Sequence, residues 1–395
     1  MPKKTVRDIE VKGKRILLRV DFNVPLDVNT GAISNDSRIR ASLPTIKYLV
    51  DHKAKIILCS HLGRPKGKVV EELRMAPVAQ RLSQLTGLCV STAHDCVGQE
   101  IESKVKALEE GDILFLENVR FYPEEETNDP HFARKLAKLA DVYVNDAFSA
   151  AHRAHASTVG VAKYLPAVAG FLMEKELQIM DKLLTNPEHP FACLVGGAKV
   201  GDKIGLLQKM LKRVDILLVG GGMAATFLRA QGYEAGRSLI EEDKLSLARE
   251  LLQEAEEWKV PLLLPIDVVV AEEIKAEAPA EVVHTADVPP GSYIVDIGPQ
   301  SIELFCNKLE KCRTVVWNGP MGVYEIPQFA QGTKSLANFL STLNATTVIG
   351  GGSTAEVVQE MGLTNKITHV STGGGASLRF LEGAPLPGVE VLLDK

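Results

Sequence analysis

The sequence predicts an α/β protein with two Rossmann-like domains, each a parallel sheet covered by helices. Three observations support this class. Short, β-rich apolar runs recur along the whole chain. Segments with helical periodicity lie between many of these runs. The chain has 395 residues, more than the roughly 250–300 at which a single hydrophobic core stops growing, so two domains are expected.

The apolar runs predict strands because each is apolar on both faces, as in a parallel sheet buried between helices. In chain order these strands are Ile16–Val20, Lys55–Cys59, Asp112–Leu116, Asp141–Val144, Phe191–Val195, Ile216–Val219, Pro261–Pro265, Thr314–Trp317, Thr346–Ile349 and His369–Ser371. The expected helices are Pro44–His52, Met75–Leu85, Pro130–Leu139, Met173–Leu184, Glu241–Trp258 and Gln331–Leu340. Alternating strands and helices indicate right-handed βαβ crossovers.

The domain boundary is expected near 170–188, where a helix leads into a polar loop before the next strand. This gives a first domain at 1–170, a connecting helix and loop at 171–188, and a second domain at 189–381. The tail, 382–395, contains Gly and Pro but no helical pattern, and we expect it to pack on the first domain. Residues 1–170 carry 25 basic and 21 acidic residues, whereas the remainder carries 20 and 29. A more basic first domain is suited to an anionic small molecule.

Composition excludes several classes of protein. The net charge of −5 argues against a general nucleic-acid binder. No run of 18 apolar residues is present, so no membrane span is expected, and the N-terminus lacks a secretory signal pattern. The six cysteines form no CxxC pair and have no nearby His at zinc spacing, which favours reduced thiols and a cytoplasmic protein.

Polar and cationic residues follow the strands of the first half. They are Arg38, Arg64, Arg120, Arg153 and His61, each expected on a loop. Ligands of open α/β sheets bind beyond the carboxyl ends of the strands, so these loops should share one edge. The planar fork of Arg suits phosphate and carboxylate groups. The pattern therefore predicts a site for a small anionic substrate.

Glycine follows the strands of the second half instead. The four turns are Val195–Lys199, Val219–Met223, Ile349–Ser353 and Thr372–Ala376. Glycine lets backbone N–H groups approach a phosphate or a flat base closely. Lys199 and Lys203 are four residues apart and would share one face of a helix. This half is therefore expected to bind a phosphate-bearing ligand.

The two halves together favour phosphoryl transfer across a cleft, which requires mainly positioning and charge neutralisation. A second interpretation stays open, because Gly220–Ala225 and Gly350–Ala355 both match GxGxxA. That pattern is found in NAD(P)-dependent dehydrogenases. No Walker A motif and no protein-kinase motif set is present.

Seven motifs, in their order along essentially the whole chain, resemble the phosphoglycerate kinase family. They are Asp21–Pro25, Ser60–Pro65, Glu117–Phe121, Ala151–Ser157, Gly196–Lys203, Trp317–Gly322 and Ser371–Ser377. The resemblance implies reversible phosphoryl transfer between 1,3-bisphosphoglycerate and ADP, giving 3-phosphoglycerate and Mg-ATP. It also implies a monomer of two domains joined by a hinge helix, with the active site in the interdomain cleft and the tail on the first domain.

The resemblance also assigns residues to roles. The triose would be held by Asp21, Phe22, Asn23, Arg38, His61, Leu62, Gly63, Arg64, Arg120 and Arg153. The nucleotide would be held by Lys203, Gly220, Gly221, Gly298, Asn318, Glu325, Gly351, Gly352, Ser353 and Thr354. The transferred phosphoryl would lie between Arg38 and Lys199, beside the amides of Gly373, Gly374 and Gly375.

The chain departs from the family pattern at two positions. Ser353 stands where the family usually has an Asp associated with the Mg-nucleotide, so we expect an active enzyme with altered affinity for the metal or the nucleotide. Glu356, or the nucleotide's own phosphates with water, would compensate. A nucleotide-binding protein without turnover is therefore a third interpretation. Ser149 stands where Gly is usual, and we expect little effect from it.

Overall fold

The computed structural model describes residues 2–27 and 30–395 and divides the chain into two compact units. Unit 1 comprises the residues up to Gln178 together with Pro385–Lys395, and unit 2 comprises Ile179–Ala384. The first boundary falls inside helix α6 (Phe171–Thr185), within the segment that the sequence predicts as the connection.

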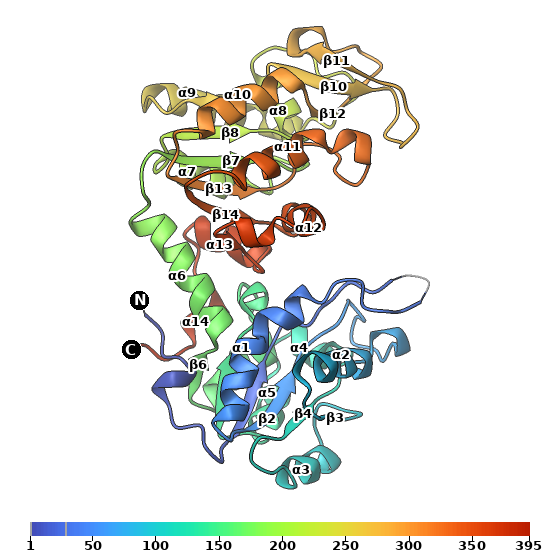
Figure 1. The fold of residues 1–395 in the computed structure, drawn as a ribbon, viewed down its shortest axis with the longest axis vertical. Coiled ribbons are helices and arrows are strands. Elements are labelled where there is room, and N and C mark those ends of the chain that lie inside the picture. Colours follow the sequence, from blue (N-terminus) through green and yellow to red (C-terminus); the bar gives the residue numbers. More distant parts are fainter. Residues whose placement is uncertain (1, 28–29) are drawn as a thin grey trace. The chain divides into compact units, whose positions relative to one another are not determined.

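Unit 1 is built on a six-stranded parallel sheet in the order β3-β4-β2-β1-β5-β6. Figure 1 labels β2, β3, β4 and β6 of this sheet. Its strands are β1 (Arg15–Arg19), β2 (Lys55–Cys59), β3 (Val90–Thr92), β4 (Ile113–Phe115), β5 (Val142–Asn145) and β6 (Ala167–Ala169). Its helices are α1 (Ser37–Asp51), α2 (Ala76–Thr86), α3 (Gln99–Lys106), α4 (Pro123–Glu126), α5 (Pro130–Ala137), the first part of α6, and α14 (Pro387–Glu390).

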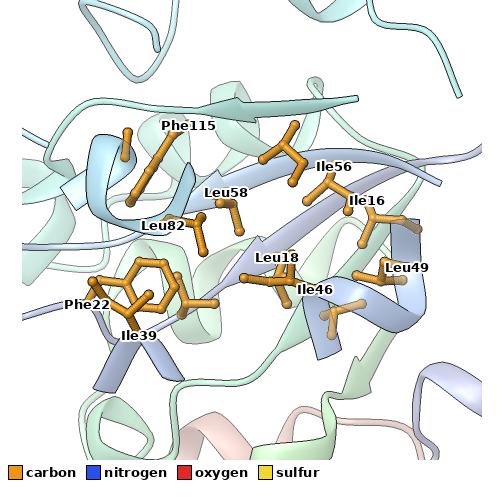
Figure 2. Packing of buried hydrophobic residues seen from close by; sticks show 14 of the residues in the cluster. Ile16, Leu18, Phe22, Ile39, Ile46, Leu49, Ile56, Leu58, Leu82 and Phe115 are labelled. Carbon is orange, nitrogen blue, oxygen red and sulfur yellow. The ribbon is translucent and has the colours of Figure 1, made fainter. Parts of the chain in front are cut away.

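The core of unit 1 follows from side-chain alternation along the strands. Ile16 and Leu18 of β1 point to one face of the sheet, where Ile46 of α1 lies beside Leu18 and Leu82 of α2 lies beside Leu58 of β2 (Figure 2). Leu17 is also fully buried, and the two-residue period of a strand places it on the opposite face. Both faces of the central strand are therefore covered, which explains why its sequence is apolar without alternation.

The tail completes unit 1. The Leu393 N–H donates to the Ala167 carbonyl of β6, and the Lys4 N–H donates to the Leu393 carbonyl, both at 2.8–2.9 Å. The Lys395 N–H reaches the Pro2 carbonyl at 3.0 Å. Figure 1 accordingly marks the two ends of the chain close together. The tail contains the short helix α14, which the sequence analysis did not predict.

Unit 2 contains a second six-stranded parallel sheet in the order β15-β14-β13-β7-β8-β9. Its strands are β7 (Phe191–Val195), β8 (Ile216–Val219), β9 (Leu262–Leu263), β13 (Thr314–Asn318), β14 (Thr346–Gly350) and β15 (His369–Val370). Its helices are α7 (Ile204–Leu211), α8 (Met223–Ala230), α9 (Leu245–Glu257), α10 (Pro299–Leu309), α11 (Gln331–Leu340), α12 (Gly352–Glu360) and α13 (Gly375–Leu381).

A three-stranded antiparallel sheet in unit 2 was not predicted. It has the order β11-β10-β12, with β10 at Asp267–Ala271, β11 at Ala280–His284 and β12 at Tyr293–Ile297. Strand β11 is mostly exposed and carries polar residues, so it lacks the continuous apolar run that marks the other strands. The segment forms a strand because it pairs with β10, and no local sequence pattern encodes this pairing.

The predicted fold class is confirmed: each unit has a parallel sheet with helices against it. Strands β2, β7 and β8 and helix α11 have the predicted bounds. Helix α1 begins at Ser37 rather than at Pro44, which lies inside the helix. Among the described residues, no helix is long and apolar enough to cross a membrane.

Candidate functional site

The first site lies where the strand order of unit 1 changes direction. Strand β1 pairs with β2 on one side and with β5 on the other. In open α/β sheets the crevice for a ligand opens at such a point, beyond the carboxyl ends of the strands. Asp21 follows β1, and His61 follows β2, so the predicted substrate residues begin at this crevice.

Asp21 is the centre of this site. It is only 7% exposed, and its Oδ2 accepts hydrogen bonds from Arg38 Nη1 and from Ser149 Oγ. Burial is the largest single influence and opposes ionisation of Asp21, but the Arg38 guanidinium and the smaller contributions of other neighbours, the Ser149 hydroxyl among them, together lower the pKa of Asp21 to about 2. The carboxylate therefore stays charged at neutral pH and holds the Arg38 fork in place.

One detail of this cluster differs from the expectation, because Arg38 lies in the first turn of α1 rather than on a loop, so a helix fixes its backbone. The Ser149 hydroxyl donates to the same carboxylate oxygen as Arg38, and its small effect on activity stays a prediction.

A second group of contacts joins the loops after β1, β2 and β4. Asn23 Oδ1 accepts from the Gly63 N–H at 2.8 Å, and Arg120 Nη1 donates to the Gly63 carbonyl at 2.9 Å. Gly63 has a positive φ of 63°, and a Cβ there would overlap with Leu73. Burial lowers the pKa of Arg120, with partial compensation from Glu126 at 3.3 Å.

The remaining predicted residues of unit 1 differ in exposure. The side chains of Phe22 and Leu62 are buried in the core cluster, so only their backbone can face a ligand. Arg64 and Arg153 are exposed, and Arg153 Nε donates to His152 Nε2 at 3.1 Å. Unit 1 thus combines a fixed part, Asp21 with Arg38 and Arg120, and exposed guanidinium groups.

The second site lies at the corresponding point of unit 2, where β7 pairs with β8 on one side and β13 on the other. The turns after β7 and β13 touch through their backbones. The Gly196 N–H donates to the Asn318 carbonyl at 3.0 Å, and the Gly197 N–H donates to the Pro320 carbonyl at 2.8 Å. A Cβ on Gly196 or on Gly319 would overlap with the facing carbonyl oxygen. Glycine is therefore required by packing as well as by any ligand.

A cavity of about 370 Å³ opens beside these turns. Its polar lining includes Gly221, Asp296, Glu325 and Ser353, and its apolar lining is Ala198, Ala224, Pro265, Val268, Ile294, Val295, Ile297, Met321 and Val323. A largely apolar cavity with a few polar groups suits a flat organic group that carries polar substituents.

Lys203 and Asn318 form the polar contact next to this cavity. Lys203 Nζ donates to Asn318 Oδ1, while Asn318 Nδ2 is buried with no protein partner among the described residues. Burial lowers the pKa of Lys203. Asn318 Nδ2 is thus a buried donor available to a ligand.

The two predicted lysines do not share a helix face. Lys203 is the N-cap of α7, whereas Lys199 is exposed on the preceding turn. This corrects the helical interpretation of their spacing. Because Lys199 lies in a turn outside α7, its side chain is exposed to solvent and does not lie on the same helix face as Lys203.

The other predicted residues of unit 2 lie at helix starts and turns. Gly298 is the N-cap of α10, Gly351 is the N-cap of α12, and Gly352 begins α12. Gly220 follows β8, where a Cβ would overlap with the Met321 sulfur. Thr354 is buried, and its hydroxyl accepts from the Gly319 N–H at 3.0 Å.

The turn before α13 contains the remaining glycines. Gly374 is the N-cap of α13. The Gly373 N–H already donates to Ser371 Oγ at 3.0 Å, so that bond must open before Gly373 can bind a phosphoryl group.

The residues around Ser353 do not form a protein cage for a metal. Among residues 2–27 and 30–395, no group of three or more His, Cys, Asp or Glu side chains is placed to hold a metal ion. Glu356 lies near the Tyr324 hydroxyl, at 3.4 Å. The described residues around Ser353 therefore do not provide a set of ligands that fits a resident metal ion.

Arg19 and Ser157 contribute to the first site but were missed as functional residues. Arg19 contacts His61, and Ser157 contacts Arg19. A charged residue at the end of an otherwise apolar strand was a signal for Arg19. Asp296, which lines the cavity of unit 2, belongs to the antiparallel sheet that the sequence did not reveal.

An α/β fold with a guanidinium-lined site in one unit and a glycine-lined site in the other defines the class: a protein that handles phosphate-bearing ligands. Comparison with known proteins makes this specific. The sequence profile named phosphoglycerate kinase matches residues 6–384, and the chain belongs to the phosphoglycerate kinase family.

Relatives of this family match the chain from end to end. It is 58% identical over 395 residues to the phosphoglycerate kinase of Pelotomaculum thermopropionicum and 56% identical to that of Moorella thermoacetica, with all of each chain covered. Two solved structures are also similar. The phosphoglycerate kinase of Coxiella burnetii has a TM-score of 0.86 at 41% identity, covering 99% of this chain and 98% of that one. That of Pyrococcus horikoshii has a TM-score of 0.88 at 34% identity, with the same coverage.

Proposed function

We propose that this protein catalyses reversible phosphoryl transfer between 1,3-bisphosphoglycerate and ADP, giving 3-phosphoglycerate and ATP. The acceptor in the ATP-consuming direction is a carboxyl group, and the reaction belongs to glycolysis and gluconeogenesis. Family membership over the whole chain supports this assignment. The observation that carries it is the pair formed by the buried Asp21 and the partly buried Arg38 at the switch point of the first sheet, because it holds a guanidinium fork at the strand ends.

Unit 1 would bind the triose. The fork of Arg38 and the exposed Arg64 and Arg153 offer donors to a phosphate and a carboxylate. Asn23 and Arg120 hold the Gly63 turn, so its backbone is already shaped before a ligand binds. His61 supplies an imidazole in the same crevice.

Unit 2 would bind the nucleotide. The largely apolar cavity beside Gly221 suits an adenine ring, and Glu325 at its edge can accept from a ribose hydroxyl. Lys203 and the start of α12, at Gly351 and Gly352, would face the phosphates. Magnesium enters this scheme as part of the Mg-nucleotide substrate.

The chemical step needs little more than position and charge. A carboxylate acceptor is already ionised at neutral pH, so no general base is required. Arg38 and Lys199 would neutralise the transferred phosphoryl group, with Gly373 and Gly374 beside it. This requires the two sites to face each other in a closed state that excludes water. We expect a cytoplasmic monomer.

The test uses 3-phosphoglycerate and Mg-ATP, with the acyl phosphate product trapped by hydroxylamine. We expect product from the wild type and essentially none from Lys199→Ala. Equal product from both proteins would contradict the proposal. A coupled dehydrogenase that reports 1,3-bisphosphoglycerate provides an independent readout.

The two alternatives give different outcomes. Thermal stabilisation by NADH but not by ADP would favour a dehydrogenase that uses Gly220–Ala225. Stabilisation by ADP without any turnover would favour a nucleotide-binding protein. Recovery of turnover in Ser353→Asp would then assign the loss to the missing carboxylate.

A further inference from the structure

Arg19 is a buried cation beneath the triose site. Its side chain lies at the carboxyl end of β1 and is 1% exposed. A guanidinium this deep is stable only when its donors are paired. Arg19 Nε donates to Ser157 Oγ at 2.9 Å, and Nη1 donates to the Val20 carbonyl. The remaining contact, from Nη2, is to His61 Nδ1 at 3.1 Å.

This contact decides which ring nitrogen of His61 carries the proton. A guanidinium has N–H donors and no acceptor. His61 Nδ1 must therefore accept from Arg19, which requires that Nδ1 carry no proton. The other neighbour of Nδ1 is Asp21 Oδ1 at 3.9 Å, too far for a hydrogen bond that would hold a proton on Nδ1. The proton of the neutral ring is then on Nε2.

The charges around His61 favour the neutral ring. Three arginines disfavour the charged imidazolium form of His61, whereas Asp21 favours it. They are Arg19 at the end of β1, Arg38 from α1 and Arg120 from the loop after β4. Burial acts most strongly and, with the three arginines, holds the pKa of His61 well below its ordinary value. The hydrogen-bond geometry and the charges around His61 therefore both favour a neutral imidazole.

A buried anion fixes Arg19 in turn. Ser157 Oγ donates its only proton to Glu125 Oε1 at 2.6 Å, which leaves its lone pairs for Arg19 Nε. The Ser157 N–H also donates to Glu125 Oε2 at 2.9 Å. Arg19 can only donate, and both oxygens of the buried Glu125 accept from Ser157, so the direction of each bond from Arg19 through Ser157 to Glu125 is determined.

We propose that Arg19 is a positioning residue that fixes His61 as a neutral imidazole with its proton on Nε2. His61 then offers the substrate one N–H donor and no charge. The arginines of unit 1 supply the positive charge instead. The part that concerns the substrate rests on the proposed function; the part that concerns the proton does not.

The direct experiment is a long-range ¹H–¹⁵N spectrum of the full-length wild type with ¹⁵N-labelled imidazoles. We expect His61 Nδ1 to show the signal of an unprotonated nitrogen and Nε2 that of a protonated one, unchanged from pH 8 to pH 6. The signal is assigned by its loss in His61→Gln, and the exposed His131 is the reference in the same spectra. A proton on Nδ1, or conversion of His61 to imidazolium within this range, would overturn the proposal.

A pair of variants tests the consequence for the substrate. The amide nitrogen of Gln reaches about as far as Nε2, and that of Asn about as far as Nδ1. His61→Gln should raise KM for 3-phosphoglycerate by less than His61→Asn. The substrate phosphate titrates near pH 6, so KM should depend on pH in the same way in the wild type and in His61→Gln between pH 6 and 8. If Asn is the better replacement, or if the wild type shows a titration of KM near neutral pH that His61→Gln lacks, the assigned proton is wrong.

Arg19→Lys tests the positioning role. A lysine keeps the charge but loses the fixed fork, so the His61 Nδ1 and Nε2 signals should show both tautomers while circular dichroism is unchanged. Retention of the single wild-type tautomer would remove Arg19 from the proposal. None of these spectra requires turnover, so a failure here is distinct from a failure of the proposed function.

Discussion

The two candidate sites of this protein present opposite chemistry at equivalent places in their sheets. In unit 1 the strand ends carry charged side chains, and a buried carboxylate, Asp21, holds the central guanidinium. In unit 2 the strand ends carry glycine, and the turns touch backbone to backbone. Unit 1 therefore depends on the identity of side chains, whereas unit 2 depends on their absence.

This difference predicts how each site fails. Removing a side chain from unit 1 should lower activity with little effect on folding. Adding a single carbon to unit 2 should affect folding and nucleotide binding together. The following variants test this contrast, beginning with the largest expected effect.

Gly319→Ala should destabilise unit 2 by about 3–5 kcal/mol. Gly319 has a φ of +98°, and a Cβ would overlap with the Gly196 carbonyl. Gly362→Ala is the matched control, because Gly362 has a φ of +68° with nothing within 4 Å of the added carbon. Urea unfolding and ADP titration measure both effects. Equal losses of stability in Gly319→Ala and Gly362→Ala would show that Gly319 is necessary because of its positive φ and not because of its close contact with the Gly196 carbonyl.

Arg38→Ala should lower kcat by about 10²–10³-fold, the usual cost of removing one preorganised charge-stabilising donor. The fold should persist, because Arg38 is only partly buried. Arg40→Ala removes the same charge from the same helix, at an exposed position paired with Asp36, and should leave kcat near the wild-type value. Similar losses of kcat in Arg38→Ala and Arg40→Ala would mean that the total positive charge of unit 1 matters and the position of Arg38 does not.

The acids of the two sites should respond to pH in opposite directions. Asp21 has its pKa lowered from 3.8 to about 2, so its contribution to stability is present above pH 3.8 and is lost as the pH falls through 2. Burial raises the pKa of Asp296 to about 7, despite backbone hydrogen bonds from Gly332 and Ile297. Its contribution is present below pH 3.8 and is lost as the pH rises through 7.

Unfolding in urea between pH 5 and 9 measures this difference. The wild type should lose stability across this range, and Asp296→Asn should remove that component of the slope. Asp21→Asn should keep the slope, since Asp21 is ionised throughout the range. An unchanged slope in Asp296→Asn would show that Asp296 is already ionised at pH 5.

Ser353→Asp should lower the Mg²⁺ concentration needed for half-maximal activity by about tenfold, equivalent to ~1.4 kcal/mol. A carboxylate is a better ligand for Mg²⁺ than a hydroxyl, and Ser353 lines the cavity of unit 2. Asn has nearly the same shape as Asp but no charge, so Ser353→Asn should not lower the Mg²⁺ concentration needed for half-maximal activity. An equal gain in both variants would assign the effect to shape.

Ser149→Gly should have the smallest effect, a rise in KM for 3-phosphoglycerate of about twofold to fivefold with kcat unchanged. The variant removes one of the two side-chain donors to Asp21 Oδ2. Ser149→Ala separates the lost hydroxyl from added backbone freedom, so both variants should behave alike. A wild-type KM in both would restore the expectation that this position matters little.

Most strands of the parallel sheets were predictable because they are apolar on both faces, as in Phe191–Val195, which has the predicted bounds. The short edge strands β3 and β6 of unit 1 were not predicted. The antiparallel sheet was not, because the exposed residues of Ala280–His284 carry no periodic signal and pair only through tertiary structure. The start of α1 was misplaced because Pro44 resembles a helix start, yet the helix continues through it.

The candidate site residues were predictable where a polar side chain directly follows a strand, as for Asp21 and His61. The partners beneath them were not. Arg19, Ser157 and Glu125 are far apart in the sequence, and only the folded sheet brings them into one hydrogen-bonded chain. The sequence therefore predicts the groups that we propose to face a ligand, but not the groups that we propose to fix their protonation.

The return of the tail to β6 has a consequence for synthesis. Unit 2 is an insertion within unit 1, since Pro385–Lys395 follows it in the chain and belongs to unit 1. During synthesis, unit 1 is therefore begun first and completed last, because its edge strand β6 is hydrogen-bonded to Leu393 of the tail. Because the Lys395 N–H donates to the Pro2 carbonyl, a circular permutant with joined ends and new termini at an exposed loop of unit 2 would make unit 1 continuous in the chain.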